Sequence, residues 1–148
     1  MRFRRQNVWA AILGATAILF ATGCSQVSSR MGSASDSTPT LSGTEEVPPV
    51  NTQASGVSRI AVIGDKTIIG TVEISNLNAT AAHIHQAPRG QNGPVIIPLV
   101  KTGENVWSVP GNTVLTSAQF DAYRSGNLYV NVHSAANPNG EIRAQLKP

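Results

Sequence analysis

Short runs of alternating or apolar residues, separated by turn-forming residues, constrain the fold of this chain more than any other feature. Residues 66–74 alternate, with Ile68, Gly70, Val72 and Ile74 on one face and mainly polar residues on the other. This is the period-two pattern of a half-buried strand. A mainly apolar run over 59–63, which begins with Arg59, precedes it, and the Gly64-Asp65 pair lies between the two. The two segments together predict a β-hairpin.

Five further segments share these strand signals, and one segment predicts a helix. The strands are expected at 80–85, 95–100, 105–109, 128–133 and 141–146, with loops at 88–94 and 137–140. Pro98 indicates that the strand over 95–100 lies at an edge or contains a bulge. Thr116 and Gln119 form a capping box for a short helix that Gly126 can end. About seven short strands and one short helix predict an all-β fold, an antiparallel β-sandwich.

Composition supports this fold class and excludes some functions. Charged residues make up only 13% of the chain, and 13 Gly and 9 Pro favour a turn-rich β domain over a helical bundle. Three of the 11 basic residues are Arg2, Arg4 and Arg5, and without them basic and acidic residues balance at 8 each. That balance argues against a nucleic-acid-binding protein. A single Cys excludes a disulfide framework and a CxxC metal or redox site.

The N-terminus has the features of an export signal, which we assign to residues 1–23. The three arginines precede an uncharged run over 8–20, which is shorter than the about 20 residues that span a bilayer. The run ends in Ala21-Thr22-Gly23-Cys24, which resembles the bacterial lipobox, with Ala21 at the position where Leu is usual. The resemblance implies that the Cys24 thiol is acylated. The alternative is an ordinary signal peptide followed by an incidental Cys.

The mature chain is expected to consist of a tether and a domain. Residues 24–40 would be the lipidated N-terminus and a flexible tether, because this segment is rich in Ser and has almost no large apolar side chain. Residues 41–148 would form the domain. Lipid chains anchor a protein to a membrane, so the expected location is the bacterial cell envelope, with the domain facing the periplasm or the exterior. Which membrane holds the anchor is left open.

The three histidines are the best candidates for a functional site. His83 and His85 are two residues apart on a predicted strand and therefore share a face. His133 ends a later strand, also on its less apolar face. Neutral imidazole is a common ligand of copper and zinc, and the sequence places no thiolate and no pair of carboxylates near these histidines. The alternative is that each His serves the fold through hydrogen bonds.

Arg143 is a second candidate. It shares a strand face with Glu141 and Gln145, opposite the apolar face formed by Ile142, Ala144 and Leu146. The alternative to a functional role is a solvated strand face on which Glu141 and Arg143 pair, which would contribute less than about 1 kcal/mol.

Several segments together resemble the CHRD domain, a family named from repeats in the animal protein chordin and common in bacterial envelope proteins. The matching segments are 41–50 (LSGTEEVPPV), 81–85 (AAHIH), 93–95 (GPV), 128–133 (LYVNVH) and 137–143 (NPNGEIR). The resemblance covers essentially all of 41–148. It does not supply a reaction, since most bacterial members lack an assigned activity.

A weaker resemblance is to copper/zinc superoxide dismutase. The order of strand, HxH, loop and Gly-Pro, followed by a later strand, His, loop, Gly-x-Arg and strand, is similar in both. It implies a Greek-key β-sandwich in which His83, His85 and His133 bind copper and Arg143 steers an anion toward the open position. This sequence departs from that family because the His that bridges copper and zinc, the zinc ligands and the disulfide have no counterparts. A dismutase-like redox reaction is therefore less well supported than metal binding.

Two functional hypotheses follow. In the first, the chain is an envelope lipoprotein that binds a metal, copper rather than zinc, through three His. In the second, it is a non-enzymatic module of the envelope, either structural or binding another protein, with no metal. Whether the three imidazoles converge in the fold separates the two hypotheses. The sequence leaves the partner and the oligomeric state open.

Overall fold

The computed structural model describes residues 38–148, so the predicted signal peptide, Cys24 and most of the tether lie outside the described residues. The strands are β1 (Thr40–Ser42), β2 (Ser55–Ser58), β3 (Ala61–Ile63), β4 (Thr67–Ile69), β5 (Thr71–Ser75), β6 (Ala79–Gln86), β7 (Val95–Pro98), β8 (Val100–Gly103), β9 (Val106–Ser108), β10 (Leu128–Ser134) and β11 (Ile142–Gln145). A 3-10 helix, η1 (Gly43–Glu45), follows β1, and the helix α1 (Ser117–Arg124) precedes β10.

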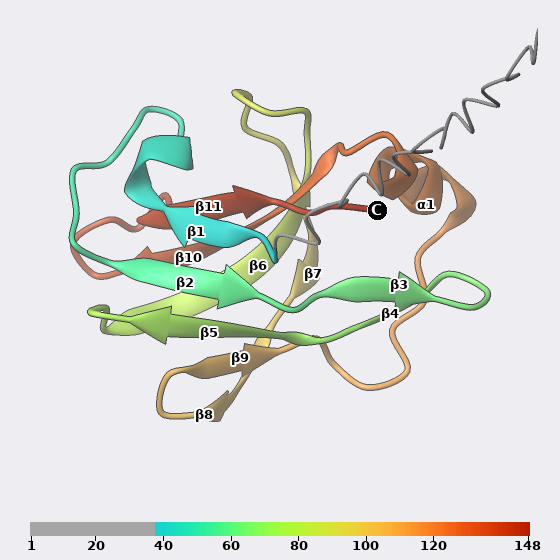
Figure 1. The fold of residues 1–148 in the computed structure, drawn as a ribbon, viewed down its shortest axis with the longest axis horizontal. Helices are drawn as coiled ribbons and strands as arrows, with labels where there is room; N and C mark the ends of the chain where they lie inside the picture. The colour runs from blue at the N-terminus through green and yellow to red at the C-terminus, as the bar shows by residue number, and fades with distance from the viewer. Residues whose placement is uncertain (1–37) are drawn as a thin grey trace, which may run out of the picture. The chain divides into compact units, whose positions relative to one another are not determined.

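Nine of these strands form one antiparallel sheet that curls back on itself (Figure 1). The order across the sheet is β7-β6-β10-β11-β1-β2-β5-β9-β8, while β3 and β4 form a separate hairpin. β7 and β8 lie at opposite edges of the sheet, yet only Leu99 separates them in the chain. The two edges must therefore approach each other. The predicted antiparallel all-β fold with one short helix is confirmed, and its two layers are the two halves of one continuous sheet.

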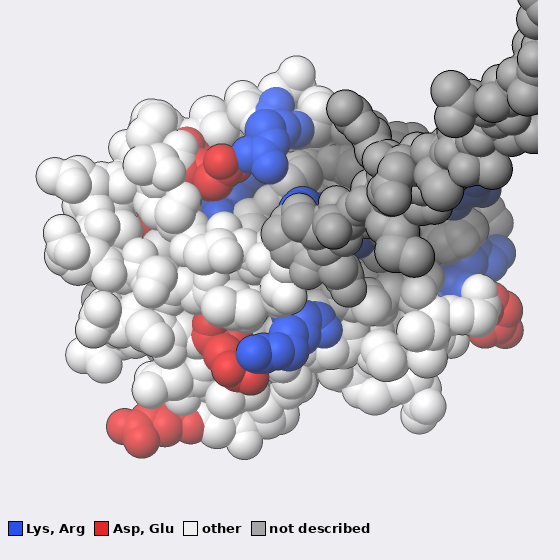
Figure 2. Space-filling view, in the orientation of Figure 1, with Lys and Arg blue, Asp and Glu red and all other residues white. Residues whose placement is uncertain are grey.

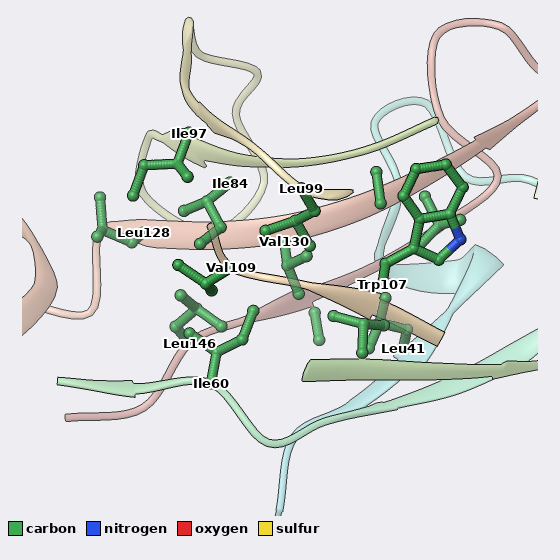
Figure 3. Close-up of a cluster of buried hydrophobic side chains, with 14 of the residues drawn as sticks. Leu41, Ile60, Ile84, Ile97, Leu99, Trp107, Val109, Leu128, Val130 and Leu146 are labelled. Atoms are coloured by element: carbon green, nitrogen blue, oxygen red, sulfur yellow. The ribbon is translucent and has the colours of Figure 1, made fainter. Parts of the chain in front are cut away.

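The hydrophobic core fills the space between these two halves (Figure 3). Ile84 and Val130 enter it from β6 and β10, and Trp107 enters it from β9. Ile84 and Val130 are fully buried, and Trp107 is nearly so. At roughly 1.5–3 kcal/mol for each fully buried large apolar side chain, this layer supplies the main driving force for closing the sheet.

The predicted hairpin forms, but its second strand is shorter than the sequence suggested. β3 pairs with β4 around the Gly64 turn, and Gly70 then separates β4 from β5. Gly70 has a φ of 124°, and a Cβ at this position would overlap the backbone oxygen of Arg59. Alternation still gives the correct buried face, because Ile68 and Val72 are both fully buried.

The predicted strand over 95–100 also divides into two. Pro98 ends β7, which lies at an edge of the sheet as its proline indicated. After Leu99 the chain enters β8 at the opposite edge. β1 and β2 were not predicted, since both are short and contain mainly small or polar residues.

The helix signals are confirmed in detail. The Thr116 side chain accepts a hydrogen bond from the Gln119 backbone N–H, and the Gln119 side chain accepts one from the Thr116 N–H. Gly126 follows the helix with a φ of 70°. The buried Tyr123 connects α1 to the C-terminal end of the chain, because its hydroxyl donates a hydrogen bond to the backbone oxygen of Lys147 at 2.8 Å.

Several charged side chains form small mixed groups on the surface. Arg59 pairs with Glu73, and Arg89 pairs with Glu45. Figure 2 shows acidic and basic side chains next to each other on the face in view. Within residues 38–148, no helix has the length and apolar character needed to cross a bilayer.

Gly70→Ala is expected to lower the free energy of unfolding by at least about 2 kcal/mol, because it combines a left-handed φ with a backbone overlap. Gly111→Ala is the matched control, since nothing lies within 4 Å of a Cβ at that position. Urea unfolding followed by circular dichroism measures both variants. Equal stability of the two variants would contradict this account of the β4–β5 break.

Candidate metal centre

Antiparallel pairing of β6 with β10 brings the three predicted histidines together. The register places His85 opposite Tyr129, His83 opposite Asn131 and His133 opposite Ala81. All three imidazoles therefore project from the outer face of the same strand pair. Each ring offers one nitrogen, either Nδ1 or Nε2, and these three nitrogens all lie within 4.8 Å of one another. The convergence that the metal hypothesis requires is present.

Two of the rings are oriented by backbone carbonyls. The Nδ1 of His85 lies 2.9 Å from the oxygen of Gly93, and the Nδ1 of His133 lies 3.0 Å from the oxygen of Pro138. A carbonyl oxygen can only accept, so each Nδ1 carries the proton and each Nε2 carries a lone pair. This is the arrangement in which metal-binding histidines are normally held.

Of the two Nε2 lone pairs, that of His133 has a hydrogen-bond partner and that of His85 has none. The Nε2 of His133 lies 2.9 Å from the Nδ1 of His83, which can donate its proton to it. The Nε2 of His85 is buried and has no hydrogen-bond partner. An unpaired buried acceptor costs about 1–3 kcal/mol, and a bound cation would remove that cost.

The donor set and its spacing fit a metal ion. Ligand nitrogens at about 2.0–2.1 Å from a zinc-sized ion lie roughly 3–4 Å from one another. The observed separations reach 4.8 Å, so small side-chain rotations would close the site. His83 is partly exposed, whereas His85 and His133 are buried. The site is thus open to solvent on the His83 side.

The surroundings keep the imidazoles neutral. Burial lowers the pKa of all three rings below the usual value of about 6.5. For His83, the adjacent imidazoles of His133 and His85 lower the pKa further. A neutral ring is the form that binds a metal, so the site can take up a cation at neutral pH without first releasing protons from imidazolium groups.

The family model described as CHRD domain matches residues 38–146, nearly all of the described part of the chain. The chain belongs to the CHRD domain family. Neither the curated proteins nor the solved structures compared with it gave a match. The resemblance seen in the sequence motifs is therefore confirmed for the family, and the CHRD domain includes all three histidines.

Arg143 is linked to the histidines of this CHRD domain through the ring of Tyr129. Its guanidinium carbon is 3.4 Å from the centroid of the Tyr129 ring, and the same ring stacks on His85. Because β11 and β6 lie on either side of β10, Arg143 and His85 approach Tyr129 from opposite sides. Only 1% of Arg143 is exposed. The alternative of a solvated strand face is therefore wrong, and Glu141 bonds to Thr52 and Ser134 rather than to Arg143. The role of Arg143 as an anion guide stays a prediction.

Two loops of the CHRD domain cover this outer face and explain the burial. Asn92, in the loop between β6 and β7, donates a hydrogen bond to the backbone oxygen of Val47 at 2.7 Å. The Gln145 side chain donates to the oxygen of Ala87, at the start of the same loop, at 2.9 Å. Consequently every residue of β10 and β11 is buried. Alternation identified the face but could not indicate that loops would cover it.

Sequence reasoning missed Glu46, a buried carboxyl in the polar layer of the CHRD domain. Only 5% of Glu46 is exposed. Burial raises its pKa to about 7, although the nearby positive charge of Arg143 lowers it. Its Oε1 lies near Gly140, where a Cβ would come within 2.6 Å of it. The signal was available, because Glu46 and Gly140 both lie in the segments that resemble the family.

These pKa shifts predict how the stability of the metal-free domain depends on pH. The folded histidines have pKa values below those of the unfolded chain, so they destabilise the fold as pH falls through about 6.5. Glu46 has the opposite effect on stability, since its folded pKa of about 7 exceeds the usual 4.5. Its contribution to the stability of the fold therefore grows as pH falls.

Glu46→Gln should therefore steepen the loss of stability between about pH 7.5 and about pH 5.5, by roughly 2 kcal/mol. His83→Gln should make that loss shallower. Urea unfolding in the presence of a chelator measures both effects. Parallel pH profiles for the wild type and Glu46→Gln would show that Glu46 titrates normally in the folded domain.

Proposed function

We propose that this protein is a membrane-anchored lipoprotein of the bacterial envelope whose CHRD domain binds copper through His83, His85 and His133. The observation that carries the metal proposal is the buried Nε2 of His85, which has no partner and lies beside two other imidazoles. A structural His normally has both of its nitrogens satisfied. Here a lone pair is kept available where three rings converge.

The ligand set favours copper over other ions. All three donors are imidazole nitrogens, which suit copper, zinc, iron and nickel, and copper(II) binds most tightly among the divalent first-row ions. Three protein ligands leave room for a further ligand, and the partly exposed His83 supports access from solvent. Bound copper would supply one-electron redox chemistry. The residues of this chain would hold the ion, keep its ligands neutral and admit a small molecule beside His83.

A second candidate is a structural or protein-binding module without metal. The observation that favours it is the contact of 2.9 Å between His83 Nδ1 and His133 Nε2, which satisfies one lone pair without an ion. The two candidates differ in what becomes of the His85 Nε2. The metal proposal gives that atom a bound cation, whereas without a metal the polar group that acts on His85 is the side chain of Asn131.

The anchor is proposed at Cys24. Support comes from the lipobox-like residues 21–24 and from the Ser-rich tether that follows them. Two acyl chains would hold the domain stably at a membrane surface, because each buried methylene contributes roughly 0.8 kcal/mol.

Purified protein carrying Cys24→Ser, which removes the only thiol, is expected to bind one copper ion per chain. His83→Ala combined with His133→Ala should abolish this binding, because only one of three ligands remains. Isothermal titration and elemental analysis measure uptake, and circular dichroism checks the fold. Copper uptake that survives in the folded double variant would overturn the three-histidine site.

Cys24→Ser is expected to release the protein from the membrane fraction, because no acyl chains can then be attached. Cell fractionation followed by immunoblotting measures the change, and mass spectrometry of the wild-type N-terminus should show the added acyl mass. Ser25→Ala is the matched control and should remain membrane-bound. An unmodified Cys24 in the mature wild type would refute the anchor.

A further inference from the structure

We infer that Tyr129 is the positioning residue for the metal ligand His85; this inference rests on the proposed copper site. The rings of Tyr129 and His85 are nearly parallel, with an angle of 10° between their planes and centroids 4.8 Å apart. They face each other directly across the β6–β10 pair. A ring stacked on a flat neighbour cannot rotate about χ2 without losing that contact. The stack therefore fixes the plane of the imidazole.

The opposite face of Tyr129 is held by Arg143. The guanidinium carbon lies 3.4 Å from the ring centroid, in the geometry of a cation–π contact. The guanidinium donates longer hydrogen bonds, at 3.4–3.5 Å, to Asn92 Oδ1 and the Pro88 oxygen in the β6–β7 loop and to Gln145 Oε1 on its own strand. Tyr129 is thus enclosed between a cation and an imidazole and cannot tilt away from His85.

The Tyr129 hydroxyl also contacts the Gly93 peptide, which is the hydrogen-bond partner of His85. The backbone N–H of Gly93 donates to the Tyr129 oxygen at 3.2 Å, while the Gly93 oxygen accepts from His85 Nδ1. A Cβ on Gly93 would overlap the backbone oxygen of Gln86, so this peptide fits closely against β6. Tyr129 therefore contacts His85 through its ring and holds the carbonyl acceptor of His85 through its hydroxyl.

The consequence is a preorganised Nε2 lone pair. With the ring plane fixed by Tyr129 and the Nδ1 proton fixed by Gly93, Nε2 of His85 has one orientation before the metal arrives. Substitutions of groups that orient a metal-binding His typically lower metal affinity by about 10–100-fold. Arg143 thereby acquires a role that does not require it to meet an incoming anion.

The test compares Tyr129→Leu, which removes the stack, with Tyr129→Phe, which keeps the stack but loses the hydroxyl. Copper affinity should fall about 10–100-fold in Tyr129→Leu and by a smaller factor in Tyr129→Phe. Tyr123→Leu is the matched control, because Tyr123 is also a buried tyrosine and its hydroxyl donates a hydrogen bond to the backbone oxygen of Lys147. It should lower stability without changing copper affinity.

A second readout does not involve copper. The chain has only three histidines, so ¹⁵N-histidine NMR of the metal-free protein can follow each ring. His85 should be the Nδ1–H tautomer in the wild type and in Tyr129→Phe. In Tyr129→Leu it should become a mixture of tautomers, with faster exchange of the Nδ1 proton.

These two readouts separate the inference from the proposed function. A wild type that binds no copper but shows the Tyr129-dependent tautomer would refute the copper site and leave the positioning of His85 supported. Unchanged copper affinity and an unchanged His85 tautomer in folded Tyr129→Leu would overturn the inference. If Tyr129→Leu does not fold, Arg143→Met decides by the same two measurements, since it frees the ring without removing it.

Discussion

The antiparallel pairing of β6 with β10 is the interaction on which the rest of this structure depends. It sets His85 beside Tyr129 and His83 beside Asn131, and it brings His133 within reach of His83 although 50 residues separate them in the chain. Because side chains alternate along a strand, a slip of one residue would turn the imidazoles into the core and the aliphatic residues outward. The hydrophobic core thus fixes the register, and the register fixes the site.

The outer face of this strand pair is polar yet largely buried, which is costly unless each group has a partner. The β6–β7 loop and the loop that contains Val47 cover this face. Within the described residues, most of its polar groups are satisfied by carbonyls, amides or ring faces. The exceptions in this layer are the Nε2 of His85, the Oδ1 of Asn131 and the Oε1 of Glu46. A rigid surrounding from which water is excluded, with an unpaired imidazole nitrogen, is what a preorganised metal site needs, and the same burial keeps the imidazoles uncharged.

Local signals in the sequence predicted much of the fold and the shared strand face of two of the three site histidines. Alternation gave the correct faces for Ile68 and for His83 with His85, and the capping box gave the start of α1. The break at Gly70 was missed because it depends on a close approach to Arg59, which lies on another segment. The burial of Arg143 was missed for a similar reason, since the covering loop is distant in sequence. The strand patterns raised the meeting of His133 with the other two rings only as a hypothesis, which the weaker resemblance to copper/zinc superoxide dismutase strengthened, because register between distant strands is set by tertiary packing.

The central claim is that the three imidazoles form one copper site, and anomalous diffraction at the copper absorption edge tests it most directly. Crystals of the copper-loaded protein are expected to show a single strong peak within bonding distance of a nitrogen from each of His83, His85 and His133. A peak at any other position, or full copper occupancy with the His85 ring still lacking a partner, would contradict the account.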